Sequence, residues 1–227
     1  MNAMGAVLEV KEVSKVYGAG ASRVIAVDAV TLAINKGEVL LIMGPSGSGK
    51  TTLLSIMGCI LRPTSGEVLI EGRGISTLSE DELPDIRKNH IGFVFQSFNL
   101  FPSLTAAENV ELVLRLKGYD KKRIKAQAMD LLEKVGLVKR AALYPADLSG
   151  GEKQRTAFAR ALAGDPPIIL ADEPTANLDS KTGKEALTLL RTLAEESGKA
   201  IAIVSHDPKA EELAHRVVFL EDGRLKT

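Results

Sequence analysis

The feature that most limits the fold is a glycine-rich segment between an apolar run and a stretch with helical spacing. The segment GPSGSG at 44–49 follows the apolar run VLLIM at 39–43 and opens the helical stretch KTTLLSIMGCIL at 50–61. An unbroken apolar run is typical of a strand buried in a parallel sheet. Glycines in such a turn let backbone N–H groups surround an anion at the helix N-terminus. The sequence therefore predicts half of a βαβ unit with a phosphate-binding turn.

Lys50 and Thr51 complete the pattern G-x-x-x-x-G-K-[ST] of that turn. In this pattern the lysine ammonium reaches the β and γ phosphates of a nucleotide, and the hydroxyl binds Mg²⁺. The alternative is a glycine-rich turn that matches by chance, and the strand-turn-helix context disfavours it. The turn therefore predicts a nucleotide site.

The patterns around this unit alternate between sheet and helix. Before the turn, residues 7–13 and 29–34 carry alternating or short apolar runs with glycine-rich breaks between them, which predicts an antiparallel N-terminal sheet. After the turn, the sequence predicts a hairpin at 66–74, a polar helix at 79–88 and a strand at 91–96. Residues 105–163 differ, because they contain three segments with apolar residues at i, i+3 and i+4 and no strand between them.

Sheet and helix alternate again towards the end of the chain. Strands are expected at 167–172 and 199–205, helices at 180–197 and 208–214, and a final hairpin ends at Thr227. We therefore predict an α/β fold with a mostly parallel sheet, an N-terminal antiparallel β subdomain and an inserted α-helical subdomain. We treat residues 1–227 as one domain, with a core lobe of about 1–96 and 157–227 and a helical subdomain of about 97–156.

Composition removes several classes of partner. The 29 Lys and Arg residues balance 29 Asp and Glu, so no net positive field draws the chain to nucleic acid or anionic lipid. The single cysteine, Cys59, excludes an internal disulfide and lies in an apolar stretch, where we expect it to be buried. No apolar run approaches the ~18 residues that cross a bilayer, and the N-terminus lacks a signal-peptide pattern. We therefore expect a cytoplasmic chain without direct lipid insertion.

Two carboxylates follow the apolar run PIILA at 167–171. Ligands of parallel sheets bind outside the carboxyl ends of the strands, so both side chains are predicted to point at the phosphate turn. Asp172 is placed to hold Mg²⁺ and its waters, and Glu173 to accept a proton from an attacking water. Taken alone, this pair could be an ordinary polar turn after a strand.

A second helix start also has the features of an anion site. In LSGGE at 148–152, Ser149 suits an N-cap, and Glu152 suits the third position of a capping box. Gly150 and Gly151 leave the backbone bare, although glycine lowers helix stability. A well-capped helix without a ligand is the alternative, and it needs no pair of glycines.

With these motifs in this order, the chain resembles the ABC-type ATPases along its whole length, including their LSGGQ signature. The resemblance implies a RecA-like P-loop NTPase core. It places Tyr17 where the family stacks an aromatic ring on adenine, Gln96 at the Q-loop, Asp179 at the D-loop and His206 at the switch histidine. Considered alone, Tyr17 is a strand-edge aromatic, Gln96 and Asp179 are polar loop residues, and His206 is a structural histidine.

The resemblance also implies ATP and Mg²⁺ as cofactors, and a homodimer in the ATP-bound state whose two chains pack head to tail around two nucleotides. Within one chain, ATP is expected to contact Tyr17, Gly44, Pro45, Ser46, Gly47, Ser48, Gly49, Lys50, Thr51 and Thr52. From the partner chain it is expected to contact Ser149, Gly150, Gly151, Glu152 and Asp179. The expected Mg²⁺ residues are Thr51, Gln96 and Asp172, and the expected catalytic residues are Glu173, His206, Gln96 and Lys50.

Glu152 departs from the signature, which has glutamine at this position. A carboxylate near a polyanion should slightly weaken closure around ATP unless Lys153 or Arg155 compensates for it, although glutamate keeps a capping-box role.

Two stretches indicate a branch of the family. Residues 91–112 and 170–183 are similar to the lipoprotein-release and macrolide-export branch of ABC ATPases. The first stretch is also similar to polar amino-acid importers, but Ala171 and the sequence Asn177-Leu178-Asp179 favour the export branch. The apolar run Phe98–Leu104 predicts a groove for a membrane permease, or else local packing of the loop.

We therefore predict a motor subunit that binds and hydrolyses ATP on the inner face of the cell membrane, held there by a permease. Two other classes remain open. A soluble ABC ATPase acting on ribosomes or DNA would usually carry two ATPase halves or a long coiled-coil insertion, and neither pattern is present. A regulatory module that binds ATP without hydrolysing it would be expected to lack Glu173. The transported substrate is not encoded in a motor that never touches it.

Overall fold

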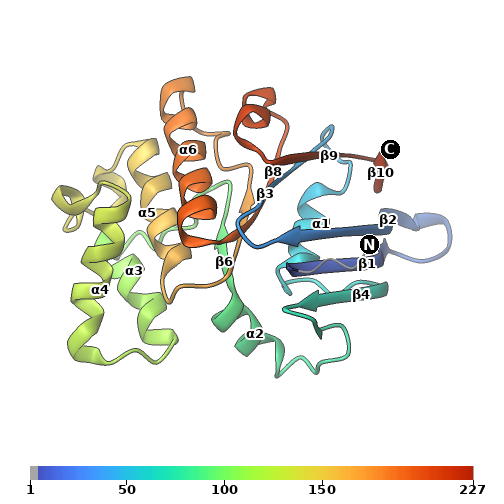
Figure 1. The fold of residues 1–227 in the computed structure, drawn as a ribbon, viewed down its shortest axis with the longest axis horizontal. Helices are drawn as coiled ribbons and strands as arrows, with labels where there is room; N and C mark the ends of the chain where they lie inside the picture. The colour runs from blue at the N-terminus through green and yellow to red at the C-terminus, as the bar shows by residue number, and fades with distance from the viewer. Residues whose placement is uncertain (1–4, 227) are drawn as a thin grey trace.

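The computed structural model describes residues 5–226 and contains two sheets, with three helices gathered at one end (Figure 1). The first sheet is antiparallel, in the order β2-β1-β4-β5, and the second has the order β10-β9-β3-β8-β7-β6. Side chains of both sheets meet in one apolar cluster, which includes Leu8, Leu40 and Ile168. The α/β class with an antiparallel subdomain is therefore confirmed. Residues 1–4 and 227 of the predicted domain lie outside the described residues.

The larger sheet is parallel except at one edge. Its strands are β3 (Val39–Met43), β6 (Ile91–Val94), β7 (Ile168–Asp172), β8 (Ala200–Ser205), β9 (Arg216–Glu221) and the antiparallel edge strand β10 (Arg224–Lys226). Every residue of β3 and β8 is buried, which explains their unbroken apolar sequences. Because β3, β6, β7 and β8 are parallel, the segments that follow them meet at one edge of the sheet.

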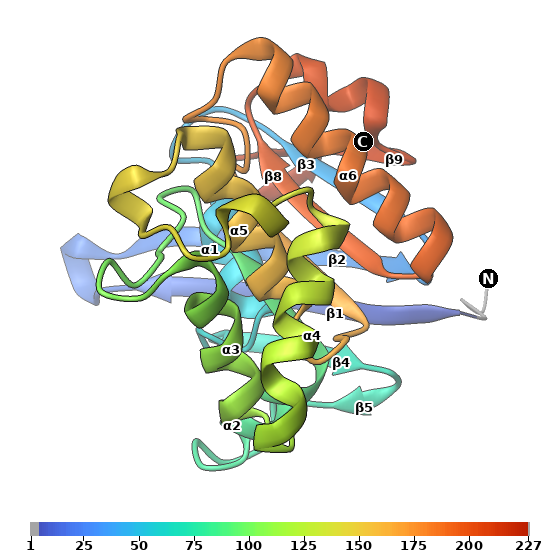
Figure 2. The same cartoon turned by 90° about the vertical axis from the view of Figure 1, so that its left-hand side faces the viewer.

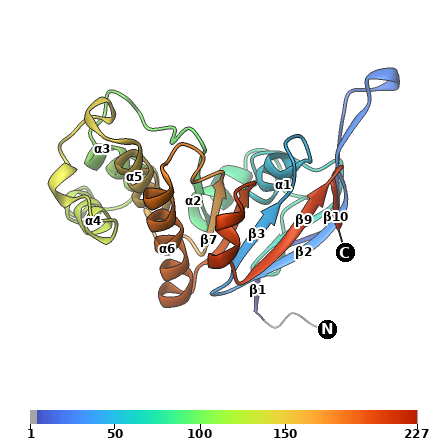
Figure 3. The same cartoon turned by 90° about the horizontal axis from the view of Figure 1, so that it is seen from above.

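The antiparallel sheet is longer than predicted. Its strands are β1 (Ala6–Tyr17), β2 (Val24–Asn35), β4 (Ser65–Ile70) and β5 (Arg73–Gly74). Register shifts, with positive φ at Glu12 and Ala29, interrupt the β1–β2 pairing, and the interrupted alternation hid the full length of both strands. Between them, η1 (Gly20–Ser22) forms the tip of a hairpin that projects from the body (Figure 3).

The inserted helices are α3 (Ala106–Leu116), α4 (Lys121–Lys134) and α5 (Gly150–Leu162), with short turns η2 (Val138–Arg140) and η3 (Pro145–Asp147) before α5. Figure 2 views this end directly, and residues 105–163 contain no strand, as predicted. Since α5 packs against α3, α4 and β6, one apolar cluster continues from the helices to the sheet. The subdomain limits of 97–156 stay a prediction, and the second limit falls inside α5.

The other helices are α1 (Lys50–Met57), α2 (Leu83–His90), α6 (Ser180–Ser197) and the turn η4 (Pro208–Leu213). The prediction for α6 is confirmed at both ends. The helix α1 ends before the predicted residue 61, because Gly58 follows it and Cys59 has a φ of +54°. Cys59 is buried as expected, and burial raises the pKa of its thiol to about 11.

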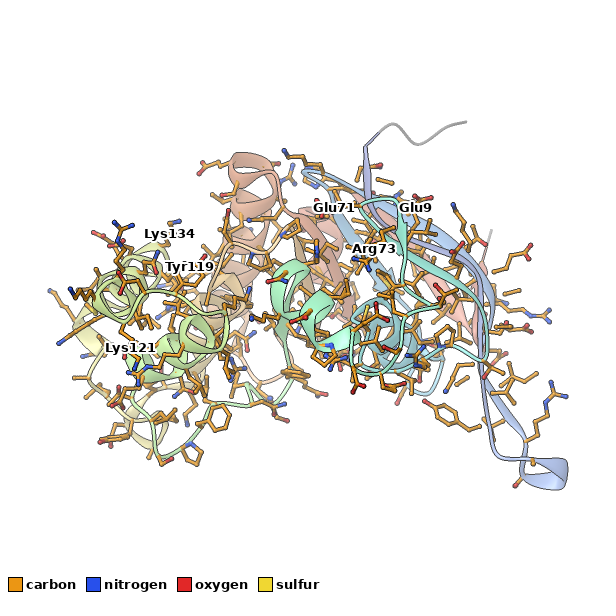
Figure 4. All side chains as sticks on the ribbon, turned by 90° about the horizontal axis from the view of Figure 1, so that it is seen from below. Glu9, Glu71, Arg73, Tyr119, Lys121 and Lys134 are labelled. Carbon is orange, nitrogen blue, oxygen red and sulfur yellow. The ribbon has the colours of Figure 1, made fainter. Side chains whose placement is uncertain are left out.

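The molecule is elongated, with the parallel sheet between its two ends. Figure 4 shows Lys121 and Lys134 at the helical end, and Glu9 and Glu71 outside it, on the side of the antiparallel sheet. Within residues 5–226, no helix combines the length and the apolar character needed to span a membrane.

Candidate functional site: a phosphate-binding cleft

The phosphate turn joins β3 to α1 through glycines that no other residue can replace without strain. Gly44 and Gly49 have φ values of +152° and +99°, and Gly49 is the N-cap of α1 without a side-chain cap. A Cβ atom on Gly44 would lie 2.0 Å from the carbonyl oxygen of Leu220. A Cβ atom on Gly49 would lie 2.0 Å from the carbonyl oxygen of Ala26. The first N–H groups of α1 are therefore left free for a ligand.

Lys50 lies folded into the turn and is only 8% exposed. Its Nζ donates hydrogen bonds to the carbonyl oxygens of Gly44, at 2.7 Å, and Pro45, at 2.8 Å. None of the ion pairs found among residues 5–226 includes Lys50. An ammonium has three donors, so one remains for an anion in the cleft.

The turn forms the floor of a cleft of about 640 Å³. Ten of its eleven lining residues come from the phosphate turn, the first turn of α1 and three other predicted catalytic positions, and the eleventh lies in β2. The full lining is Ala26, Pro45, Ser46, Gly47, Gly49, Lys50, Thr51, Thr52, Gln96, Glu173 and His206. Gly44 and Ser48 are absent from this lining, and the Ser48 side chain is buried beneath the turn.

Thr51 and Asp172 join α1 to the end of β7. The Thr51 hydroxyl donates a hydrogen bond of 3.1 Å to Oδ1 of Asp172. Burial raises the pKa of the Asp172 carboxyl, and neighbouring Glu173 raises it further, while the hydrogen bond from Thr51 opposes them. A cation at this place would offset the buried charge.

The chemistry of these two side chains fits Mg²⁺. Both offer oxygen atoms, which this ion prefers, and the residues from 5 to 226 contain no cluster of three His, Cys, Asp or Glu side chains that would suggest another metal. A magnesium ion in a nucleotide site is usually bound by one or two protein oxygens, with waters and phosphate oxygens as its other ligands.

Glu173 and His206 form a pair at the cleft wall. Glu173 follows β7 with a φ of +45°, in the left-handed region that non-glycine residues seldom adopt. Its Oε1 lies 2.8 Å from Nδ1 of His206, and the hydroxyl of Ser205 lies 3.4 Å from Oε2. The Glu173 side chain is 13% exposed, whereas His206 is 68% exposed and open to the cleft. This arrangement orients a carboxylate in the cleft that the phosphate turn also lines.

Gln96 reaches the cleft from the segment after β6. Its carbonyl oxygen accepts a hydrogen bond of 2.8 Å from Nδ2 of Asn177, which lies between β7 and α6. This bond ties the segment that carries Gln96 to the segment that carries Asp179. Sequence patterns did not single out Asn177 for this contact, because its partner is a backbone atom 81 residues earlier.

The second predicted anion site lies outside this cleft. Ser149 caps α5, its Oγ accepting from the backbone N–H of Glu152 at 3.3 Å and its own N–H donating to Oε2 of Glu152 at 2.8 Å. None of Ser149, Gly150, Gly151 or Glu152 lines the cleft. One chain therefore presents two separate helix starts.

Comparisons with known proteins agree with this geometry. Residues 27–176 match the family model described as ABC transporter. Over 223 residues, the chain is 49% identical to an uncharacterized ABC transporter ATP-binding protein of Thermotoga maritima, covering 98% of this chain and 95% of that protein. The chain belongs to the ABC transporter family. It is an ABC-type ATPase, as the sequence predicts.

Two further relatives bear on its organisation. The structure of the ATP-binding cassette MJ0796 of Methanocaldococcus jannaschii, described as dimeric and bound to ADP and Pi, superposes with a TM-score of 0.89 at 46% identity, covering 97% of each chain. The macrolide export ATP-binding/permease protein MacB of Salmonella paratyphi A is 43% identical over 222 residues. These residues are 98% of this ABC ATPase but only 34% of MacB.

Two further residues predicted for the site of this ABC ATPase, Tyr17 and the partner-contacting Asp179, do not line the cleft of their own chain either. Tyr17 ends β1, is 43% exposed, and has Nζ of Lys15 at 5.4 Å from its ring centre. From the β1–β2 hairpin, Ala26 lines the cleft instead. Asp179 caps α6, accepting from the N–H groups of Lys181 and Thr182 and from the Thr182 hydroxyl. Within one chain, both residues are therefore held outside the nucleotide cleft.

Arg140 was missed by the sequence patterns. Its Nε donates a hydrogen bond of 2.7 Å to Oε1 of Glu152, so this arginine compensates the carboxylate of the ABC signature. Lys153 and Arg155 were the two residues considered for this compensation. Arg155 lies 3.8 Å from Glu185 instead, and within residues 5–226 neither forms an ion pair with Glu152. The pKa of Glu152 falls to about 2, mainly through the N–H of Ser149 and then through Arg140.

Proposed function

We propose that this ABC ATPase is the motor of a membrane transport complex of the lipoprotein-release and macrolide-export branch. The observation that carries this proposal is the Glu173–His206 pair in the same cleft as the phosphate turn, with a second helix start outside it. The first feature supports hydrolysis within the cleft. The second supports a site completed by another chain. The similarity to MacB favours export over import.

The phosphate turn binds the triphosphate in this proposal. Lys50 donates its free N–H to a phosphate oxygen, and its other two N–H groups then transfer from the turn carbonyls to phosphate oxygens. Thr51 and Asp172 hold Mg²⁺, and Gln96 lies at the cleft edge beside them. When bound, the ion neutralises charge on the β and γ phosphates. The oxygen pair and the uncapped start of α1 support this assignment.

Hydrolysis then depends on the pair at the cleft wall. Glu173 accepts a proton from water while the water oxygen bonds to the γ phosphorus. The bond from that phosphorus to the β–γ bridging oxygen breaks, and its electron pair leaves with ADP. His206 holds the carboxylate through Nδ1 and, with Gln96, orients the γ-phosphate and the water. These steps require no covalent intermediate with the protein.

Two chains pack head to tail in the ATP-bound state. The start of α5, with Ser149, Gly150, Gly151 and Glu152, then faces the nucleotide of the other chain, together with Asp179. This arrangement explains why these five residues lie outside the cleft of their own chain. The dimeric structure of the relative MJ0796 supports it.

A permease docks near Phe98–Leu104 and holds the motor at the inner face of the membrane. Two of these side chains, Phe98 and Leu100, pack against the interior, whereas Phe101 is 50% exposed. Arg160 donates hydrogen bonds to the carbonyl oxygens of Phe98 and Asn99, and these bonds hold the loop that contains Phe98–Leu104 against α5. The apolar surface that this loop offers to a permease therefore consists of Phe101 and its neighbours. Neither nucleic acid nor inserted lipid is part of the proposed assembly.

Substitution of the base tests the proposed mechanism. Glu173→Gln should lower ATP turnover by about 10² to 10⁴, because a carboxamide cannot accept the proton, while ATP binding persists and the ATP-bound dimer accumulates. Phosphate release and sedimentation with ATP measure the two effects. Glu196→Gln, at an exposed position of α6, is the matched control and should hydrolyse ATP normally. Unchanged hydrolysis in Glu173→Gln would falsify the assignment of the base.

Purification from native membranes tests the partner. The tagged protein should be recovered with a multispanning permease, and Phe101→Ser should lower that recovery several-fold, because it removes the exposed apolar contact. Leu116→Ser, which changes another exposed apolar residue on α3, is the control and should keep the permease bound. Recovery with ribosomes or DNA would instead favour a soluble ABC ATPase.

A further inference from the structure

We propose that Arg140 is a positioning residue for ATP-driven dimerisation, because its guanidinium neutralises Glu152 at the helix start that accepts the partner chain's nucleotide. The inference rests on the proposed head-to-tail dimer. It assigns a role to a segment, residues 138–140, that the cleft of a single chain does not use.

Both oxygens of the Glu152 carboxylate are fixed. Oε2 accepts from the backbone N–H of Ser149 at 2.8 Å, and Oε1 accepts from Nε of Arg140 at 2.7 Å. The side chain is 17% exposed, so solvent screens it only in part. Side chains in a helix tilt towards its N-terminus, so this carboxylate points back over the start of α5.

Arg140 approaches from outside the helix. It ends η2, where its backbone N–H donates to the Leu137 carbonyl and its own carbonyl accepts from Leu143, both at 2.9 Å. The backbone is therefore held, while the side chain is 51% exposed. A guanidinium in this place adds a positive charge to the helix start without occupying its N–H groups.

The balance of charge decides what this helix start can bind. Glu152 alone favours the helix, since an anion in the first turn interacts well with the helix dipole, but it repels a phosphate arriving at the same point. With Arg140 bound, the two side chains sum to zero. The partial positive charge of the N-terminus and the bare N–H groups of Gly150 and Gly151 then remain for the phosphate.

The test uses a double-mutant cycle in the Glu173→Gln background, in which the ATP-bound dimer accumulates. Sedimentation over a range of protein concentrations gives the dimer Kd with ATP. Arg140→Ala should raise this Kd about fivefold to tenfold, because each dimer then contains two Glu152 carboxylates without a neutralising arginine. Arg140→Ala/Glu152→Gln should return close to the Kd of Glu152→Gln alone, since glutamine keeps the capping box without charge. Arg123→Ala, an exposed arginine of α4, is the control.

The outcomes separate a charge effect from a structural one. Binding of a fluorescent ATP analogue to the monomer should be the same in Arg140→Ala and its parent. A Kd that does not change in Arg140→Ala, or one that stays raised in the double variant, overturns the role of Arg140 while the dimer itself stands. Absence of any ATP-dependent dimer in the Glu173→Gln parent overturns the proposed function and this inference together.

Discussion

The starts of α1 and α5 are both helix N-termini rich in glycine, yet they satisfy their backbone donors in opposite ways. At α1 the N-cap is Gly49, which has no side chain to accept from the helix. At α5 the N-cap is Ser149, which forms a complete capping box with Glu152. The first start is left open for a ligand within its own chain. The second is already stable without a ligand.

This difference in capping suits two sites whose ligands stay bound for different lengths of time. An uncapped helix start is costly without its ligand, so α1 gains most from a nucleotide that stays bound. A capped start loses little when its ligand departs, which suits the proposed dimer, in which α5 meets and releases the nucleotide of another chain in each cycle. In that dimer the same glycine-rich pattern serves a longer-lived contact at α1 and a shorter-lived one at α5, depending on the cap.

The largest difference between the two starts should appear when their glycines are replaced. Gly49→Ala should lower the free energy of unfolding by about 3 kcal/mol or more, because the φ of +99° is strained for alanine and the new Cβ meets the Ala26 carbonyl. Gly151→Ala should cost less, since its Cβ meets the Thr182 methyl group at 2.3 Å, and a side chain can move. Urea unfolding of both variants measures the difference.

A second substitution tests whether the Thr182 methyl group causes the loss of stability in Gly151→Ala. Thr182→Ser removes the methyl group and keeps the hydroxyl that donates to Asp179. The double variant Gly151→Ala/Thr182→Ser should recover most of the lost stability. Equal losses of stability in Gly49→Ala and Gly151→Ala would contradict the proposed difference, which is that a new Cβ meets a fixed backbone atom at Gly49 and a movable side chain at Gly151.

The sequence predicted what depends on neighbouring residues. The phosphate turn, the strand before it and the helix α6 could all be placed, because glycines, apolar runs and the Asp179 cap act locally. Lys50, Thr51 and Glu173 were predicted from the turn pattern and the strand end, and Gln96 and His206 only through motif order, and the structure brings all five into one cleft. Parallel strands explain this, since their carboxyl ends share an edge.

Contacts between distant backbone atoms could not be predicted. Ala26 lies 23 residues before Gly49 and acts through its carbonyl oxygen, which alanine shares with every residue. Arg140 was not predicted because it precedes Glu152 by 12 residues, whereas Lys153 and Arg155 follow Glu152 along α5 and its side chain points back towards the helix start. The pair of glycines was explained by an anion alone, but Gly151 also allows α5 to approach Thr182.

Removal of the Lys50 ammonium at the start of α1 should cost nearly as much free energy of ATP binding as Gly49→Ala costs in free energy of unfolding. Lys50→Met should weaken ATP binding to the monomer about 100-fold, the usual worth of a charged hydrogen bond. Anisotropy of a fluorescent ATP analogue, at protein concentrations too low for dimers, measures it. Lys125→Met, on the exposed face of α4, is the control. Ser149→Ala should leave this affinity unchanged, and an equal loss there would mean that both starts serve one site.

The smallest effect should distinguish α5 from α3, the other helix with a complete capping box. Thr105 and Glu108 form that box, and the pKa of Glu108 is lowered chiefly by the N–H of Thr105, without a hydrogen-bonded arginine. Glu152 has the same cap and also Arg140, and its pKa lies near 2 instead of 4.5. A depressed pKa stabilises the fold above the unfolded value, and this contribution is lost as pH falls from about 4.5 towards 2.

Comparison of Glu152→Gln and Glu108→Gln with the parent chain tests this linkage. At pH 6 the free energy of unfolding of the parent should exceed that of Glu152→Gln by about 1 kcal/mol. This is less than the full linkage value, because solvent screens a surface carboxylate. The difference should stay nearly constant until the pH of urea unfolding approaches about 4.5, and should then shrink as the pH is lowered further towards 2. Glu108→Gln should show the same direction and a smaller change, since its carboxylate lacks the arginine. A larger change at Glu108 would mean that the cap, and not Arg140, sets the difference between the two helix starts.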